Sequence, residues 1–154
     1  MQILVRRAIA DDAPAILQLN IVYDDVRATV AHIATHIKSY SHFETPFVAV
    51  INERVVGLAC LRLLHCLCDP VPYAELTELI VDPLYRRQKV GQSLIRHIEQ
   101  EAQNQGAVTL TLATAWQNNA AQAFYHAMGY RLYTITMQRS LLDMLESDIA
   151  RSST

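Results

Sequence analysis

Residues 78–92 read Glu78-Leu79-Ile80-Val81-Asp82-Pro83-Leu84-Tyr85-Arg86-Arg87-Gln88-Lys89-Val90-Gly91-Gln92. The apolar run at 79–81 suits a buried strand, and Pro83 keeps the residue before it out of helical backbone geometry. Apolar residues then recur at helical spacing, which predicts an amphipathic helix with Val90, Leu94, Ile95, Ile98 and Ala102 on one face. The stretch therefore reads as a strand, a turn, a basic loop and the start of a helix.

The basic loop gathers Arg86, Arg87, Lys89 and Gly91 where the predicted helix begins. A helix start presents unpaired backbone N–H groups and the positive end of the macrodipole, so it attracts anions. Composition alone is compatible with two interpretations, a solvated basic turn or an anion-binding site. The order of the residues favours the second.

Residues 81–91 resemble the acyl-coenzyme-A-binding motif of the GNAT family of N-acetyltransferases. The family pattern is Arg or Gln, two residues, Gly, one residue, then Gly or Ala. Arg86 fills the first position and Gly91 the last, while Lys89 stands at the usual first glycine and Arg87 at another frequent glycine. Glycine lets the backbone close on a pyrophosphate, so Lys89 either points outward or adds a cation to the same phosphates.

A second motif lies in residues 118–130, Asn118-Asn119-Ala120-Ala121-Gln122-Ala123-Phe124-Tyr125-His126-Ala127-Met128-Gly129-Tyr130. Asn118 suits a helix N-cap and Gly129 a C-cap, and the apolar residues between them share one face, which predicts a small core helix. The segment also resembles the second cofactor motif of the GNAT family, because Asn118, Ala121, Phe124, Tyr125, Gly129 and Tyr130 fall in register. Together the two motifs carry a resemblance that covers most of the chain, from about Val5 to Leu141.

The resemblance implies one domain over residues 1–154 with an α/β fold of the α+β type. Its sheet would be mixed and strongly twisted, with six to seven strands flanked by about four helices. The patterns of the chain predict strands over residues 3–8, 47–51, 54–65 and 108–112, another ending at Val81, and one or two over 131–139. Helices are expected from Asp11, over 25–38, 87–104 and 118–128, and over 141–149, with 68–72 as a connection and a bulge near Gly57.

Composition narrows the class of protein. The 154 residues fit one domain, and a chain that is 51% hydrophobic and 18% charged is too apolar for disorder. The formal net charge of −2 argues against a general affinity for nucleic acid, which needs a basic surface. No apolar run approaches the length of a membrane span and no signal peptide is recognisable, so we expect a cytoplasmic protein without membrane contact.

The three cysteines, Cys60, Cys66 and Cys68, form an odd set that predicts free thiols in an intracellular chain. No metal site is expected. His65, Cys66 and Cys68 lack a second ligand pair at zinc-site spacing, and the pair formed by His32 and His36 lacks a third ligand.

The resemblance implies transfer of an acetyl group from acetyl-CoA to an amine of a small molecule or peptide, by direct attack. The strand residues Leu79, Ile80 and Val81 would pair with the pantetheine arm, and the N–H of Ile80 would polarise the thioester carbonyl. The pyrophosphate would lie on Arg86, Arg87, Gln88, Lys89, Val90, Gly91 and Gln92. Asn118 would cap its helix, bind the pantetheine region, or do both.

Two residues are expected to move protons. A primary amine must lose a proton before it attacks, and Glu78 is the expected base. Glu75 is the alternative, although in a regular strand the two carboxylates point to opposite faces unless a bulge intervenes. Tyr125 takes the family position of the general acid for the departing thiolate, or else it is a core aromatic residue.

Tyr23 and Asp24, with Asp25, could receive a cationic amine together with Glu75, or could be a helix start with favourable acidic charge. Tyr40, His42 and Phe43 are further candidates for the substrate wall. Dimerisation is common among GNAT proteins, so a homodimer is compatible with the resemblance. The alternative function is a non-catalytic GNAT-fold module that binds a CoA species as a sensor or interaction domain, which Lys89 in place of glycine motivates.

Overall fold

The computed structural model describes residues 2–21, 27–39 and 42–141. The chain forms two compact units, Met1–Thr114 and Ala115–Thr154. Among the helices of the described residues, none has the length and apolar character that crossing a membrane requires.

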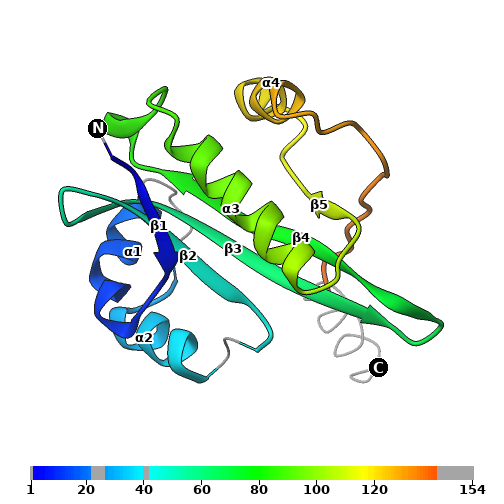
Figure 1. Ribbon diagram of the computed structural model, residues 1–154, viewed down its shortest axis with the longest axis horizontal. Helices are drawn as coiled ribbons and strands as arrows, with labels where there is room; N and C mark the ends of the chain where they lie inside the picture. The colour runs from blue at the N-terminus through cyan, green and yellow to red at the C-terminus, as the bar shows by residue number, and fades with distance from the viewer. Residues whose placement is uncertain (1, 22–26, 40–41, 142–154) are drawn as a thin grey trace, which may run out of the picture. The chain divides into compact units, whose positions relative to one another are not determined.

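The first unit is built on a sheet of five strands that lie in their sequence order (Figure 1). They are β1 (Leu4–Arg7), β2 (Thr45–Ile51), β3 (Arg54–Cys66), β4 (Asp69–Val81) and β5 (Leu110–Leu112). Neighbours from β1 to β4 are antiparallel, and β5 is parallel to β4 because the helix α3 (Val90–Asn104) carries the chain back between them. The mixed α/β fold is confirmed. The expected count of six or seven strands is not met in the described residues, where 131–139 form no strand.

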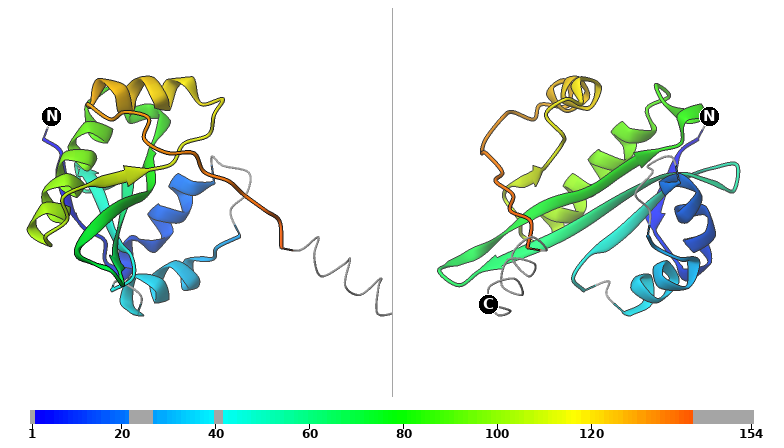
Figure 2. Two further views of the ribbon diagram at one scale, coloured as in Figure 1. Left: turned by 90° about the vertical axis from the view of Figure 1, so that its right-hand side faces the viewer. Right: turned by 180° about the vertical axis from the view of Figure 1, so that it is seen from behind.

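The helices of the first unit cover both faces of this sheet (Figure 2). On one face, α1 (Ala13–Asn20) and α2 (Val30–Ser39) pack over a cluster that includes Ile16, Val48 and Leu58. On the other face lies α3, where the rings of Phe47 and His97 are 5.0 Å apart. Because Phe47 and Val48 are adjacent in β2, they point to opposite faces and each anchors one helical layer.

Two helices begin later than their patterns predict. Residues Ala10–Asp12 form a 3₁₀ turn, so α1 begins at Ala13 and Asp11 does not cap it. The second helix begins at Val30 rather than Asp25, because Thr29 acts as its N-cap: the N–H of His32 donates to Thr29 Oγ1 at 3.1 Å.

The hairpin between β2 and β3 turns at Asn52 and Glu53 as predicted, with φ values of 47° and 65°. The bulge expected near Gly57 lies one residue earlier, at Val56, since Ala49 pairs with Gly57 and Val50 with Val55. Gly57 has a separate role. A Cβ there would lie 3.0 Å from Leu94 Cδ1 and 3.1 Å from the carbonyl oxygen of Ile80, so glycine allows α3 to approach the sheet.

Residues 68–72 are not the connection that their prolines suggested, because β4 already begins at Asp69. The N–H of Ala74 donates to the carbonyl oxygen of Thr109, on the side of β5. Pro70 and Pro72 lie where the register between β3 and β4 shifts, since Leu64 pairs with Tyr73 and Cys66 with Asp69. In this stretch the N–H of Val71 donates to Asp69 Oδ1 instead of to β3. The prolines therefore fall where the regular ladder is interrupted.

The second unit contains α4 (Asn119–Ala127), and both of its predicted caps are confirmed. Asn118 Oδ1 accepts from the N–H of Ala121 at 3.1 Å, and Gly129 follows the helix with a φ of 94°. The helix predicted over Leu141–Ile149 lies outside the described residues except for Leu141, which is not helical.

Candidate active site

A bulge in β4 decides where the carboxylates of this strand point. Cys60 pairs with Glu78 and Leu61 with Leu76, so Thr77 is one extra residue in β4. Arg62 and Cys60 alternate along β3 and share a face, and their partners across the ladder are Glu75 and Glu78. The bulge therefore brings both carboxylates to one face, the face covered by α1 and α2.

The same bulge marks the point where β4 and β5 part. β5 pairs with β4 only from Ala74 to Leu76, so no described strand occupies the second edge of β4 from Thr77 to Val81. Beyond the bulge, the N–H of Asp82 donates to the carbonyl oxygen of Val56 on β3. By alternation, the N–H of Ile80 faces β3 as well, and those of Leu79 and Val81 face the open edge. The N–H of Ile80, which was expected to polarise the thioester carbonyl, thus faces β3, because the bulge resets which residues point to the open edge.

The loop between β4 and α3 carries two residues in the left-handed backbone region. Arg87 has a φ of 63° and Lys89, the N-cap of α3, a φ of 67°. These are the two positions at which the GNAT pattern has glycine, and the left-handed region is the one that glycine enters without strain. Turns of this kind direct successive N–H groups into a concavity suited to an anion, and the first N–H groups of α3 extend it.

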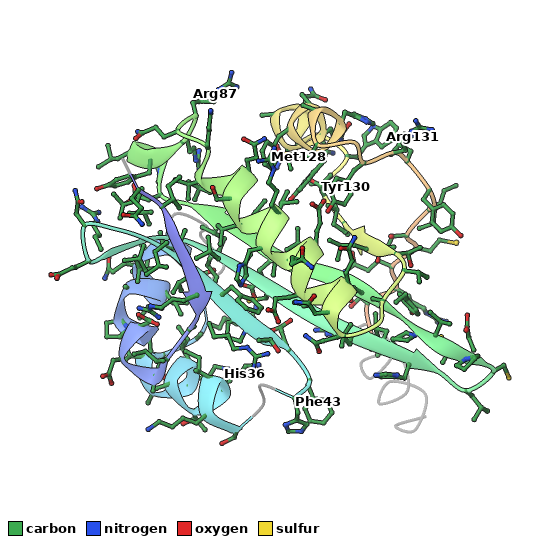
Figure 3. The ribbon with its side chains drawn as sticks, viewed as in Figure 1. His36, Phe43, Arg87, Met128, Tyr130 and Arg131 are labelled. Atoms are coloured by element: carbon green, nitrogen blue, oxygen red, sulfur yellow. The ribbon has the colours of Figure 1, made fainter. Side chains whose placement is uncertain are left out.

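Side chains of the loop hold this backbone in place. Arg86 Nε donates to the carbonyl oxygen of Val81 at 3.2 Å, and Gln88 Nε2 donates to that of Leu84 at 2.9 Å. The carboxylate of Asp82 accepts from the N–H of Leu84 at 2.9 Å and pairs with Arg54 at 3.0 Å. The side chain of Arg87 instead points away from the sheet (Figure 3). The loop therefore combines an ordered backbone with cations at Arg86, Arg87 and Lys89.

A cavity of about 310 Å³ lies under α1 and α2 and contains Glu78. Its lining comes from both helices, the segment before α2, the residue before β2, and strands β2, β3 and β4: Ile16, Asn20, Arg27, Ala28, His32, Ile33, His36, Ile37, Glu44, Pro46, Leu58, Cys60 and Glu78. Glu78 remains open to solvent at the cavity, but the surrounding protein displaces part of its hydration shell. This desolvation, with a smaller contribution from the charge of Glu44, raises the pKa of Glu78.

Glu44 joins a network of polar groups at the floor of the cavity. Thr77 Oγ1 donates to Glu44 Oε1 at 2.6 Å, and Arg62 Nη2 lies 3.3 Å from the same oxygen. Arg62 Nη1 is 3.6 Å from Glu75 Oε2, and His36 Nε2, on α2 (Figure 3), is 3.8 Å from Glu44 Oε2. Glu75 thus belongs to this network, through Arg62, rather than to the cavity lining.

Sequence reasoning missed Glu44, Thr77 and Arg62. Glu44 and Thr77 are 33 positions apart, so no local pattern could pair them. The one usable signal was the three-residue spacing of Glu75 and Glu78. With a bulge at Thr77, residues at this spacing lie on the same face of the sheet.

Cys60 lies across the ladder from Glu78 and also lines the cavity. Its burial, together with the charges of Glu78 and Glu44, raises the pKa of the thiol well above its ordinary value. The cysteine is therefore protonated at neutral pH and a poor nucleophile. Cys66 and Cys68 are exposed free thiols at the far end of the β3–β4 hairpin.

In the second unit, Tyr125 lies on α4 between two aromatic neighbours. Its ring is 5.4 Å from that of Phe124 and 5.9 Å from that of Tyr130. The N–H of Tyr130 donates to the carbonyl oxygen of Tyr125 at 3.0 Å and closes the end of the helix. Of the two roles expected for Asn118, the helix cap is confirmed.

The expected substrate residues are only partly described. Tyr23, Asp24, Asp25 and Tyr40 lie outside the described residues. The rings of His42 and Phe43 are 4.1 Å apart, but they line a separate cavity of about 320 Å³ with Arg7 and Gln105. Within the part of the chain that the structure describes, no group of three or more His, Cys, Asp or Glu side chains could hold a metal ion.

Comparisons with known proteins agree with this geometry. A family model described as the acetyltransferase (GNAT) family matches residues 13–130. The ribosomal protein bS18-alanine N-acetyltransferase of Escherichia coli (strain K12) is 39% identical over 112 residues, which cover 68% of this chain and 74% of that protein. The aminoalkylphosphonate N-acetyltransferase of Salmonella typhimurium is 29% identical over 120 residues, 70% of this chain and 78% of that one.

Solved structures with little sequence identity share the fold. An aminoglycoside N-acetyltransferase in complex with CoA superposes with a TM-score of 0.77 at 18% identity, over 91% of this chain and 95% of that chain. An aminoglycoside acetyltransferase from an uncultured soil metagenomic sample, in complex with sisomicin, has a TM-score of 0.76 at 19% identity, over 90% and 96% of the two chains.

Proposed function

The chain belongs to the acetyltransferase (GNAT) family, and we propose that it transfers an acetyl group from acetyl-CoA to an amine of a small molecule or peptide. The family model and the relative that is 39% identical support an acetyl-CoA-dependent N-acetyltransferase. The observation that carries the proposal is the position of Glu78, which lines a cavity while the next residues of β4 offer an open strand edge. An acceptor amine and an acyl donor can therefore approach β4 at the same point.

The donor fits the open edge and the loop that follows it. The outward N–H groups of Leu79 and Val81 can pair with the amide groups of a pantetheine arm, as a further strand would. The same N–H groups are candidates for polarising the thioester carbonyl, the group that acetyl-CoA supplies. The pyrophosphate is assigned to the concavity from Arg86 to Gln92, where left-handed residues and the N-terminus of α3 direct N–H groups outward.

Glu78 is the proposed base. A primary amine with a pKa of about 10 is protonated at neutral pH and must lose that proton before it attacks. A carboxylate whose pKa is raised accepts a proton more readily than an ordinary glutamate. Glu75 is the weaker candidate because it is paired with Arg62.

Tyr125 is the proposed general acid and Asn118 a proposed contact of the pantetheine region, both from the second motif. Both roles are supported by the match of Asn118 and Tyr125 to the second cofactor motif of the GNAT family. The CoA thiol, with a pKa of about 8.5, is already a fair leaving group, so the acid would accelerate its departure without being indispensable.

Direct attack by the amine is favoured over an acyl-enzyme. Cys60 is the described cysteine nearest in the ladder to Glu78, and burial keeps it in the thiol form. A thiol of this kind is unsuited to forming a covalent intermediate.

The cavity also bears on the acceptor. A volume of about 310 Å³ suits a small molecule or the first residues of a peptide, and the carboxylates of Glu44 and Glu78 favour a cationic amine. The exposed free thiols of Cys66 and Cys68 fit a reducing compartment, so the proposal retains the cytoplasmic location.

The proposal is tested by measuring free thiol released from acetyl-CoA over a panel of amines. The panel contains peptides with N-terminal alanine, aminoalkylphosphonates, aminoglycosides, polyamines and amino acids. We expect the protein to release free thiol with at least one class of primary amine. Mass spectrometry should then detect the acetylated amine. Tight CoA binding by calorimetry, without turnover of any amine and without hydrolysis of acetyl-CoA, would instead support the non-catalytic sensor.

A further inference from the structure

Glu44 lies just before β2, yet its carboxylate reaches the bulge of β4. Glu44 Oε1 accepts the hydroxyl of Thr77 at 2.6 Å, whereas the carbonyl oxygen of Cys60 is 3.4 Å from the same hydroxyl. The Thr77 hydroxyl therefore donates chiefly to the Glu44 carboxylate. This hydrogen bond is charge-assisted, and such bonds are stronger than those between neutral groups. The side chain of Glu44 is only 17% exposed, so this bond is largely protected from water.

We propose that Glu44 is a positioning residue of the acetyl transfer: through Thr77 it holds the bulge of β4 so that Glu78 faces the acceptor cavity. The inference rests on the proposed role of Glu78 as base. Glu44 is not required to touch the reacting atoms, since it acts through the strand.

The bulge needs such a support because its extra residue is outside the regular ladder. Thr77 has no partner of its own on β3, where Cys60 and Leu61 are taken by Glu78 and Leu76. A rotation of the backbone at Thr77 would turn the adjacent Glu78 toward the other face of the sheet. Anchoring the Thr77 side chain to a carboxylate on a different element removes this freedom.

Glu44 is itself held in place. Arg62 Nη2 lies 3.3 Å from Oε1, and Arg62 also reaches Glu75 through Nη1 at 3.6 Å. His36, from α2, is 3.8 Å from Oε2. The network thus ties the floor of the cavity to the helix that covers it.

The charge of Glu44 gives the arrangement an electrostatic consequence. Among the described residues, the titratable and charged groups on the side of Glu78 are Arg27, His32 and His36 from the covering segment, Glu44 before β2, Cys60 and Arg62 on β3, and Glu75 on β4. Partial desolvation and the negative charge of Glu44 both raise the pKa of Glu78. Removing the charge of Glu44 should therefore lower the pKa of Glu78 and move the acid limb of kcat/KM to lower pH.

Three substitutions separate position from charge. Thr77→Val removes the hydroxyl at nearly constant shape, and we expect kcat to fall about tenfold with an unchanged KM for acetyl-CoA. Thr77→Ser keeps the hydroxyl and should restore kcat. Glu44→Gln keeps an oxygen that can accept from Thr77 but loses the charge, so it should mainly shift the pH profile.

A measurement without substrate tests the electrostatic part of the inference independently of the proposed activity. The carboxyl carbon of Glu78, assigned by comparison with Glu78→Gln, is titrated by NMR in the wild type and in Glu44→Gln. We expect a lower Glu78 pKa in Glu44→Gln and no change in Glu53→Gln, a control at the exposed β2–β3 turn.

The outcomes distinguish the two proposals. If no amine is acetylated but the Glu78 pKa falls in Glu44→Gln, the assigned function fails while the electrostatic link stands. If the wild type is active and Thr77→Val keeps its kcat, the positioning role of Glu44 is overturned. If the Glu78 pKa is unchanged in Glu44→Gln, the electrostatic link is overturned. A double variant of Thr77→Val and Glu44→Ala should be no slower than the slower single variant, because both remove the same bond.

Discussion

Arg6 and Asp12 join β1 to the turn before α1 through two parallel hydrogen bonds, of 2.7 Å from Nη1 to Oδ2 and 2.9 Å from Nη2 to Oδ1. Asp12 is buried, and its Oδ2 also accepts the N–H of Ile9 at 2.8 Å. Because α1 forms part of the cavity wall, this pair fixes the wall to the sheet.

Replacing Asp12 with Asn should destabilise the fold by about 2 kcal/mol, since it breaks a charge-assisted pair that is only partly exposed to solvent. Burial by itself raises the pKa of Asp12, but the hydrogen bonds from Arg6 and Ile9 and the charge of Arg6 outweigh it, so the pKa is lowered. The stabilisation is therefore present above the unfolded pKa of about 3.9 and is lost as pH falls through the folded value. Urea unfolding at neutral and acid pH would show the difference between the two proteins vanishing in acid. A constant difference would contradict this account.

Gly57→Ala should push α3 away from the sheet. The added carbon would meet Leu94 Cδ1 at 3.0 Å, Ile80 O at 3.1 Å and Val90 Cγ1 at 3.2 Å, and the backbone oxygen cannot yield. We expect the free energy of unfolding to fall by about 1–3 kcal/mol. We also expect weaker CoA binding, because Val90 is the first residue of α3 and follows the basic loop between β4 and α3. Gly106→Ala is the control: no atom lies within 4 Å of its Cβ, so its cost is backbone strain at φ 87°. That variant should leave CoA affinity unchanged.

Lys89→Gly should raise stability while weakening cofactor binding. Glycine relieves a left-handed residue, a gain of about 1 kcal/mol, but removes a cation from the loop. We expect CoA affinity to fall about threefold at low ionic strength and the difference to disappear at about 1 M salt. Lys89→Asn, which tolerates the left-handed region without the charge, should show the same loss of affinity. Equal affinities for all three proteins at low salt would mean that the lysine points away from the phosphates.

Glu78→Gln should lower kcat about 100-fold, because the amine then lacks its base. The raised pKa of Glu78, due first to desolvation and then to Glu44, gives a second expectation. A carboxyl with a raised folded pKa favours folding below its unfolded pKa and loses that contribution as pH rises through the folded value. The variant should therefore be somewhat more stable than the wild type at neutral pH, and no more stable in acid. Glu75→Gln, which affects the pair with Arg62, should change kcat only a few-fold.

Tyr125→Phe should slow the chemical step without preventing it. We expect kcat to fall about tenfold or more, with CoA affinity from calorimetry unchanged, since the leaving thiol needs only modest assistance. Tyr130→Phe is the matched control, from the neighbouring ring 5.9 Å away. Equal effects of both substitutions would indicate that the hydroxyl of Tyr125 has a structural role instead.

Elements that follow from local chemistry were predicted well. Asn118 and Gly129 cap α4 as expected. The turn between the strands predicted over 47–51 and 54–65 has the left-handed backbone of a tight hairpin at Asn52 and Glu53. In each case one or two residues decide the conformation, so a short window of sequence is sufficient.

Elements that depend on a distant partner were predicted poorly. Residues 68–72 read as a connection because the sequence does not show that β3 extends far enough for Cys66 to pair with Asp69. The bulge at Thr77 depends on the register with β3, and its support by Glu44 comes from another element. The faces of Glu75 and Glu78, and the direction of the Ile80 N–H, follow from that register and could not be derived without it.

Pro70 and Pro72 also bear on how the protein behaves at high concentration. They lie on the long β3–β4 hairpin, along an edge of β4 that no described strand covers. An exposed strand edge is a template on which another chain can add a strand, the first step toward aggregation. Proline has no N–H donor, so these two residues interrupt that template, and the hairpin can project into solvent without recruiting further copies of the protein.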